Sequence, residues 1–317
     1  MYILLHLTVR LYRSGRVRGL RNEAMFRRIL FPTDFSSHAR RTLECVAGLP
    51  GIGEIILLHV AELPGRGMDR SAEEDILAGT RKSLALDRTY LETRGLAVHC
   101  RIRTSKSGSI GPIITGTADS DQVSAIVMSA RGKSRVQGIL LGTVSQHVLR
   151  HAKVPLLIMR HQFIEDLTVE RYEKFCPMIF SSVLCPTDFS DFAQDTIRRI
   201  TSMQGIGRIL LVHVVTHGET AEEILALERE AAQQLHDIAA TITQRGIPAT
   251  PIVRTGNTAD EVLAVAKEAD CSLIALNSYG RGWFSELLIG STAAEIARNA
   301  DRPVLVVRDH QVKDPRV

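Results

Sequence analysis

The stretch Pro-Thr-Asp-Phe-Ser occurs at residues 32–36 and again at residues 186–190. The landmarks around it recur at an offset of 154 residues: Asp34 and Asp188, Gly51 and Gly205, His59 and His213. Later landmarks recur at an offset of 148: Gly108 and Gly256, Gly132 and Gly280, Gly142 and Gly290, Pro155 and Pro303. We interpret the difference as a single six-residue length change in mid-repeat. A repeat of about 150 residues has the size of a globular domain, so two domains are predicted, each with its own core.

Both repeats are predicted to alternate short apolar strands with helices. In the first repeat, strands are expected at 29–31, 55–60, 97–103, 125–128 and 154–159, and helices at 37–47, 72–94, 112–118 and 143–151. In the second, strands are expected at 183–185, 209–215, 249–253, 273–276 and 304–307, and helices at 196–202, 220–245, 259–268 and 291–300. This order indicates an α/β fold with two tandem doubly wound, Rossmann-like domains, each a five-stranded parallel sheet flanked by helices. Ligands of such sheets bind beyond the carboxyl ends of the strands.

The domain boundaries follow from the repeat. We expect a leader at 1–24, which is disordered or arises from a misplaced start because Met25 begins the natural first strand. The first domain is then 25–160 and the second 178–309, with a charged linker at 161–177 and a tail at 310–317.

Charge and composition narrow the class of partner. The chain has a net charge of +4, but the leader holds five arginines and one glutamate, so the remaining 34 basic and 34 acidic residues balance. No nucleic-acid-binding face is therefore predicted. The apolar stretch Met1 to Val9 is too short to span a bilayer, so no stable membrane insertion is expected. Five cysteines without a CxxC pair fit reduced thiols in the cytoplasm, and no His/Cys cluster has the spacing of metal ligands.

A glycine-containing loop follows the fourth strand of each repeat. The first reads Ser129-Ala-Arg-Gly132, nine residues, then Gly142-Thr143, and the second reads Asn277-Ser-Tyr-Gly280, nine residues, then Gly290-Ser291. Together with the duplicated Pro-Thr-Asp-Phe-Ser, these loops resemble those of the universal stress protein family, over 25–160 and 178–309. The ATP-binding branch has a Gly where this chain has Ser129 and Asn277. Asn tolerates a left-handed backbone better than Ser, which favours the second repeat as the nucleotide site, while the cations Arg131, Lys133 and Arg135 partly favour the first.

The resemblance implies that the chain binds ATP, or AMP or ADP, with or without Mg²⁺. It implies that the ribose or adenine edge is held at Pro32, Thr33, Asp34, Pro186, Thr187 and Asp188, and that the main chain of Val60 and Val214 meets the adenine. The phosphates would lie against Ser129, Gly132, Lys133, Gly142 and Thr143, and against Asn277, Gly280, Arg281, Gly290 and Ser291. Glycines and amides at a helix N-terminus suit an anion.

Structural interpretations compete with these assignments. Thr143 with Gln146, and Thr292 with Glu295, fit capping boxes. The two aspartates could cap helices or satisfy turn amides, and His59 and His213 fit hydrogen-bonded structural positions. Lys133 and Arg281 could be solvated loop cations, and Trp283 is expected to pack.

No catalytic constellation is present in the sequence: neither a Gly-x4-Gly-Lys-Ser/Thr phosphate loop nor a nucleophile elbow occurs. The leading hypothesis is a non-enzymatic tandem protein that binds adenine nucleotide as a stress-response regulatory or chaperone-like module, with hydrolysis slow and incidental if it occurs. The alternatives are an interaction module of the same fold that binds no nucleotide and, last, a nucleotide hydrolase or phosphotransferase. In dimers of the family the final strands pair, which implies an intramolecular pseudo-dimer through 154–159 and 304–307 and leaves a further homodimer open.

Overall fold

The computed structural model describes residues 25–63, 70–105, 108–130, 141–160, 178–218, 220–279 and 289–308. The leader, the linker and the tail lie outside the described residues, as do Arg131, Gly132, Lys133, Arg135, Gly280, Arg281 and Trp283. The assignments made for them stay predictions.

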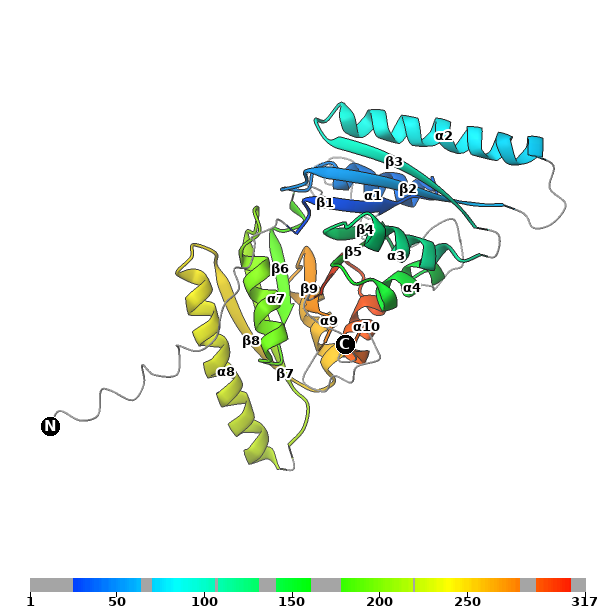
Figure 1. Cartoon of the computed structure of the whole chain (residues 1–317). Helices are drawn as coiled ribbons and strands as arrows, with labels where there is room; N and C mark the ends of the chain where they lie inside the picture. Colours follow the sequence, from blue (N-terminus) through cyan, green and yellow to red (C-terminus); the bar gives the residue numbers. More distant parts are fainter. Residues whose placement is uncertain are drawn as a thin grey trace, which may run out of the picture.

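The two halves of the chain form one ten-stranded sheet in the order β3-β2-β1-β4-β5-β10-β9-β6-β7-β8 (Figure 1). The first half contains β1 (Arg28–Pro32), α1 (Ser37–Val46), β2 (Glu54–Glu62), α2 (Arg70–Glu92), β3 (Ala97–Ser105), α3 (Ile110–Ser120), β4 (Ala125–Ser129), α4 (Thr143–His151) and β5 (Leu156–Met159). The second half contains β6 (Ser182–Pro186), α7 (Asp191–Thr201), β7 (Arg208–Val215), α8 (Ala221–Thr243), β8 (Ala249–Thr255), α9 (Thr258–Glu268), β9 (Leu273–Asn277), α10 (Ser291–Asn299) and β10 (Val304–Val307). The predicted α/β order and the five parallel strands in each half are confirmed.

The halves join where β5 meets β10, the one antiparallel pairing among the described strands. Leu157 pairs with Leu305, and the flanking pairs are arranged symmetrically about them. Because these two leucines are separated by the repeat offset, the junction has an approximate twofold relation. A second pair of equivalent residues, Phe26 and Phe180, stacks across the junction with ring centroids 6.0 Å apart.

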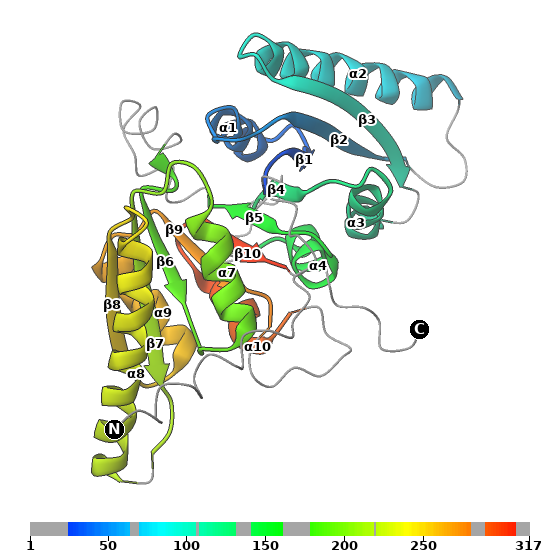
Figure 2. The same ribbon diagram turned by 60° about the vertical axis from the view of Figure 1, so that its left-hand side comes forward.

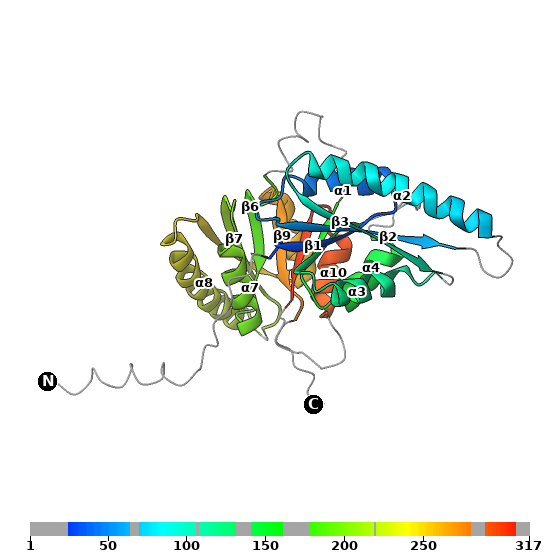
Figure 3. The same ribbon diagram turned by 45° about the horizontal axis from the view of Figure 1, so that its top comes forward.

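Helices cover both faces of the sheet. Alternate strand residues point to opposite faces, so Leu30 joins a core with α3, α4, α9 and α10, whereas Ile29 and Phe31 join a core with α1, α2, α7 and α8. Figure 3 shows α1 and α2 on one side of the first-half strands, with α3 and α4 on the other. Each core extends through both halves because the sheet is continuous, so the prediction that each repeat has its own core is wrong.

The repeated Ser of Pro-Thr-Asp-Phe-Ser begins a helix in each half. Ser36 and Ser190 are the N-caps of α1 and α7, and their hydroxyls accept hydrogen bonds from the amides of Ala39 and Ala193, each at 3.2 Å. The helix predicted to begin at 196 therefore begins at Asp191. The apolar pattern indicates only the interior of this helix, whereas its start is marked by the capping residue Ser190.

The single six-residue length change is wrong. Strand registers place Ile55 opposite Val98 and Ile209 opposite Ala249, so the offset between the repeats is 154 at β2 and β7 but 151 at β3 and β8. It is 148 at Gly108 and Gly256. The change is thus divided between the two connections on either side of β3.

The cysteines differ from expectation at one position. Cys100, Cys185 and Cys271 are free thiols, but Cys45 is disulfide-bonded, so the expectation of reduced cysteines fails for Cys45. Burial raises the pKa of Cys185 to about 12.

Among the described helices, none combines the length and apolarity needed to span a membrane.

Candidate functional site

The Pro-Thr-Asp-Phe-Ser segment forms the same tight turn after β1 and after β6. In the second copy, the hydroxyl of Thr187 accepts a hydrogen bond from the amide of Phe189 at 3.0 Å, and Asp188 Oδ1 accepts one from the amide of Ser190 at 3.0 Å. Phe189 has φ of 62°, in the left-handed region. The first copy repeats these contacts, with Phe35 at φ of 61°. Asp34 and Asp188 therefore do satisfy turn amides, while Ser36 and Ser190 act as the helix caps.

The histidine of each repeat closes this turn onto the neighbouring strand. His213 Nδ1 donates a hydrogen bond to the carbonyl oxygen of Thr187 at 2.8 Å, and its ring stacks on Phe189 with centroids 4.5 Å apart. His59 makes the same contacts with Thr33, at 2.8 Å, and with Phe35, at 4.4 Å. The structural interpretation of the two histidines is confirmed.

This turn leaves the main chain of Val214 directed past the end of β6. The last β6–β7 ladder contact is the amide of Thr187 with the carbonyl of Val212, at 2.9 Å, while the carbonyl of Val215 faces β8 and accepts from Gly256. Alternate residues of a parallel strand direct their N–H and C=O groups to opposite neighbours, so those of Val214 point to the β6 side. The next ladder contact would join Val214 N–H to Thr187 C=O, which instead accepts from His213.

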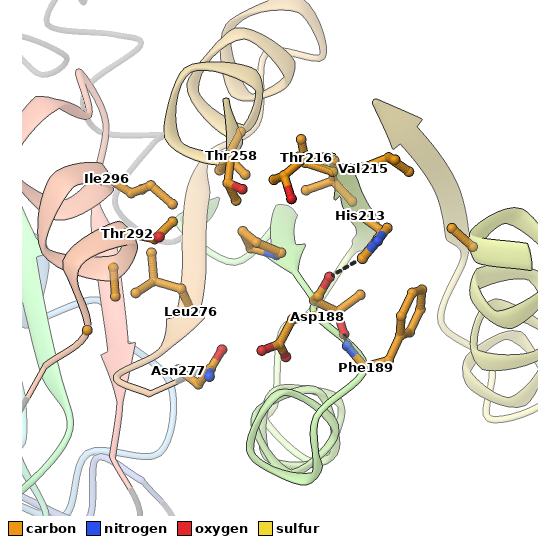
Figure 4. Close-up of a pocket in the computed structure, with 18 of the residues that line it drawn as sticks. Asp188, Phe189, His213, Val215, Thr216, Thr258, Leu276, Asn277, Thr292 and Ile296 are labelled. Atoms are coloured by element: carbon orange, nitrogen blue, oxygen red, sulfur yellow. Dashed lines mark hydrogen bonds between the residues drawn. The ribbon is translucent and has the colours of Figure 1, made fainter. Parts of the chain in front are cut away.

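A pocket of about 790 Å³ opens at this end of the second-half sheet (Figure 4). Every described residue of the second-repeat prediction lines it: Pro186, Thr187, Asp188, Val214, Asn277, Gly290 and Ser291. The structure thus brings together residues from three strand ends and one helix start. Its volume is within the range of small-molecule sites, roughly 300–1,000 Å³. In Figure 4, Asp188 and Asn277 face each other from the ends of the neighbouring strands β6 and β9.

The N-terminus of α10 forms one wall of the pocket. Its N-cap is Gly290, whose amide donates to the carbonyl of Ser278 at 2.7 Å, and Ser291 is its first residue. The N-caps of α4 and α10 are glycines with no side-chain capping bond, so the capping-box interpretation of Thr143 and Thr292 is wrong. The first turn of α10 presents backbone amides and the positive end of the helix dipole.

The backbone argument about Ser129 and Asn277 is also wrong. Each is the last residue of its strand, and they pair with Met159 and Val307 in the sheet. Neither is among the described non-glycine residues with positive φ. The replacement of Gly at these positions therefore causes no backbone strain; its consequence is a side chain, which at Asn277 lies in the pocket.

Several lining residues were missed in the sequence. Thr216 and His217 follow β7, Glu230 and Gln234 lie on α8, and Thr258 begins α9. The amide of Gln234 donates to the carboxylate of Glu230 at 3.1 Å. Only Thr258 had a local signal, because Asn257 before it caps α9 with bonds to two amides. In the sequence, Glu230 and Gln234 of α8 cannot be distinguished from the solvent-exposed polar residues of the same helix.

Tyr279 gives the pocket a buried phenol. Burial raises its pKa, and the nearby Arg308 guanidinium opposes that shift. Burial of Arg308 lowers the pKa of its guanidinium to about 10.

Among the described residues, no group of three or more His, Cys, Asp or Glu side chains is placed to hold a metal ion.

The first half places its predicted residues in the same way. Pro32, Thr33 and Asp34 follow β1, Val60 lies in β2 beyond the end of β1, and Ser129, Gly142 and Thr143 occupy the end of β4 and the start of α4. The amide of Gly142 donates to the carbonyl of Ala130 at 2.9 Å. One difference is Ser145, whose buried hydroxyl donates to the carbonyl of Ser129 at 3.1 Å; the second half has Ala293 there.

Comparison with known proteins places these observations in a family. A universal stress protein of Methanocaldococcus jannaschii is 27% identical over 160 residues, covering 44% of this chain and 97% of that protein. One from Mycolicibacterium smegmatis is 26% identical over 225 residues, covering 68% of this chain and 71% of that protein. The crystal structure of a universal stress protein from Archaeoglobus fulgidus has the same fold, with a TM-score of 0.67 at 24% identity over 90% of this chain and 97% of that one.

The profile of the universal stress protein family matches twice, at residues 25–160 and 180–308. The two matches cover most of the chain and coincide with the two halves of the ten-stranded sheet. The chain therefore belongs to the universal stress protein family and carries two of its domains in tandem.

Proposed function

We propose that this chain binds ATP, or AMP or ADP, in the pocket of its second domain, and that it works as a stress-response regulatory or chaperone-like module. The β5–β10 junction makes the two domains an intramolecular pseudo-dimer in this proposal. Hydrolysis is not its function, and its expected location remains the cytoplasm. Association of two chains and a Mg²⁺ ion on the nucleotide are left to experiment.

The observation that carries the proposal is the main chain of Val214. One N–H donor and one C=O acceptor point to the same side of β7, past Pro186, the last residue of β6. The Watson–Crick edge of adenine offers the complementary pair, the N6 amino donor and the N1 acceptor. Main-chain groups are obligatory hydrogen-bonding groups, so a ligand that pairs with both is favoured over water alone.

The opposite end of the pocket suits phosphate. Gly290 and Ser291 begin α10 there, so amides and the positive end of a helix dipole face the cavity. Asp188 lies between the two ends, where a carboxylate can accept hydrogen bonds from ribose hydroxyls. The arrangement thus provides an acceptor–donor pair for a base, an acceptor for a sugar and donors for an anion, in that order.

One observation favours a second candidate, an interaction module that binds no nucleotide. Asn277 places a side chain in the pocket at the position where the ATP-binding branch has only a hydrogen atom. If this side chain fills the space that the sugar or phosphate needs, the pocket excludes nucleotide and only the fold's surface remains for function.

Calorimetric titration with ATP, AMP, adenosine and GTP tests the proposal. The informative variant is Val214→Pro, because proline removes the N–H that points into the pocket, while the β8 ladder uses the groups of His213 and Val215. Proline also fixes φ at about −65°, so the fold of the variant is checked separately. We expect ATP to bind the native chain and to lose at least about tenfold in affinity in this variant. Val60→Pro, at the equivalent position of the first domain, is the matched control.

Thermal unfolding of both variants without ligand shows whether either has lost its fold. If the native chain gives no heat and no thermal stabilisation with millimolar ATP, the nucleotide part of the proposal is wrong. If Val214→Pro leaves ATP binding unchanged, or if the control Val60→Pro weakens it equally, adenine is not recognised by the main chain of Val214.

A further inference from the structure

Two equivalent arginines lie at the junction of the domains. Arg160 follows β5 directly and Arg308 follows β10, separated by the same offset of 148 as the paired leucines of those strands. Each is only 3% exposed. Fully buried arginines are rare in proteins, and burial of the charged group carries a cost. Two of them at symmetry-related positions therefore call for a physical explanation.

Each arginine donates hydrogen bonds to a helix of the other domain. Arg160, in the first domain, donates from Nη2 to the carbonyls of Ala297 and Arg298 in the last turn of α10. Arg308, in the second domain, donates from Nη2 to the carbonyl of Leu149 in the last turn of α4. The contacts are thus exchanged between the domains, and α4 and α10 pack against each other between them (Figures 1 and 2).

The helices held in this way are the two that begin at the candidate sites. α10 starts at Ser291 in the second-domain pocket, and α4 starts at Thr143 in the equivalent place of the first domain. The last carbonyls of a helix lack intrahelical partners, and a cation there also complements the helix dipole. Each helix is nine residues long, so the guanidinium at its end is only about 13 Å from the first residue at the ligand wall.

A third buried arginine shows that capping can be local. Arg302 is also 3% exposed, but it donates to the carbonyl of Cys271 at 2.8 Å and to that of Ala266, at the end of α9 in its own domain. An arginine that caps a helix end can therefore belong to the same domain as that helix. Among the buried arginines of the described residues, the exchange involves only the two helices that begin at the candidate sites.

We propose that Arg160 and Arg308 are positioning residues which set the phosphate end of the site in the opposite domain, so that neither site is complete without the other domain. The inference rests on the proposed nucleotide function. Arg160 holds α10 and hence the Gly290–Ser291 wall of the described pocket; Arg308 does the same for α4. A change at either arginine weakens contacts to phosphate and leaves contacts to the base unchanged.

The test compares ATP with adenosine, which lacks phosphate, on the full chain carrying Arg160→Met. Binding to the second domain is read from ligand-dependent hydrogen-exchange protection of peptides that contain residues 182–190 and 289–299. We expect ATP affinity to fall about 5- to 10-fold and adenosine affinity to stay unchanged. Arg160→Lys, which keeps the charge, recovers part of the loss.

Asp87→Asn is the matched control. Asp87 is a buried charged residue of the first domain, paired with Arg40 at 3.3 Å on the α2 side of the sheet, so its change perturbs that domain without touching α10. It should leave both affinities in the second domain unchanged. Equal losses for ATP and adenosine in Arg160→Met, or equal effects of Arg160→Met and Asp87→Asn, would overturn the proposal.

The ligand-free protein separates this inference from the proposed function. If the native chain binds no ATP, the proposed function fails, but α10 should still exchange its amide hydrogens faster in Arg160→Met than in the native chain or in Asp87→Asn. Unchanged exchange in α10 would show that Arg160 does not position this helix, whatever the ligand.

Discussion

Phe189 stacks on His213 while its own backbone is held in the left-handed region, at φ of 62°. The pair links the turn after β6 to β7, because His213 also bonds the carbonyl of Thr187 in that turn. A non-glycine residue in this conformation carries a backbone cost, which the surrounding contacts must offset. The ring stack is the contact that depends on the side chain being Phe.

This relation predicts an unusual order of stability for two variants. Phe189→Ala loses the stack and keeps the strained backbone, and we expect it to lower the free energy of unfolding by about 1–3 kcal/mol. Phe189→Gly also loses the stack but relieves the strain, which is worth about 1–2 kcal/mol and exceeds the added entropy of the unfolded chain. Urea denaturation should therefore find the Gly variant about 0.5–1 kcal/mol more stable than the Ala variant.

The same pair of variants at Phe35, with φ of 61°, provides an internal replicate in the first domain. An Ala variant as stable as the Gly variant, or more stable, at both positions would show that the left-handed backbone costs little here.

Strand and helix order was predictable because it depends on the local spacing of apolar residues. The grouping of Asp188, Asn277 and Gly290 was predictable too, since parallel strands end at one edge of a sheet. The role of Asn277 was not predictable. Its place in a loop that resembles a glycine-rich loop suggested a turn, whereas the residue pairs with Val307 inside the sheet. That distinction depends on where β9 ends, and strand ends are the part of a sequence prediction with least local information.

The exchange of Arg160 and Arg308 had no sequence signal. Both follow an apolar strand and look like the first charged residue beyond it. Their partners are backbone carbonyls of the other domain, and a carbonyl carries no side-chain identity that a pattern could reveal. Contacts of this kind appear only when the antiparallel pairing of β5 with β10 is known.

Gly111 and His147 provide a test of packing between α3 and α4. A Cβ at Gly111 would lie 2.6 Å from the His147 ring and 2.7 Å from its Cβ, so Gly111→Ala forces α4 to move. We expect a loss of about 1–3 kcal/mol in the free energy of unfolding. In a His147→Ala background the clash is absent, and the same change should stabilise α3 by up to about 1 kcal/mol.

The second domain shows the compatible combination, with Ala259 and Glu295 at the equivalent positions. A double-mutant cycle from thermal or urea unfolding measures the coupling. Additive effects of the two substitutions would mean that the ring does not restrict position 111.

The same histidine predicts a pH dependence of stability. Burial, and then the neighbouring His151, lower the pKa of His147 from its usual value of 6.5. Below pH 6.5 the unfolded chain therefore binds a proton that the folded chain resists, so the free energy of unfolding falls as the pH drops from 6.5 towards the folded pKa and levels off below it. In His147→Gln the decline of the free energy of unfolding below pH 6.5 should be shallower.

Urea denaturation at pH 7.5 supplies the reference, because His147 is neutral there in both states and any difference between the proteins reflects packing. If the free energy of unfolding falls equally with pH in the native chain and in His147→Gln, the His147 ring does not contribute to the pH dependence.

Asn277→Asp is expected to weaken nucleotide binding through charge. Asn277 and Asp188 face each other in the pocket, so a second carboxylate there would repel both Asp188 and the phosphates of a ligand (Figure 4). With an effective dielectric constant near 20, a carboxylate about 8–16 Å from a phosphate charge costs about 1–2 kcal/mol, or roughly tenfold in affinity. Asn277→Ser, which introduces the residue of the first repeat, changes size without charge and should keep ATP affinity within about threefold of native.

Calorimetry at low and at high salt completes the test, because the loss of ATP affinity in Asn277→Asp should shrink as ionic strength rises. Equal affinities of the Asp and Ser variants at low salt would place the phosphates away from Asn277 and assign the anion to another wall of the pocket.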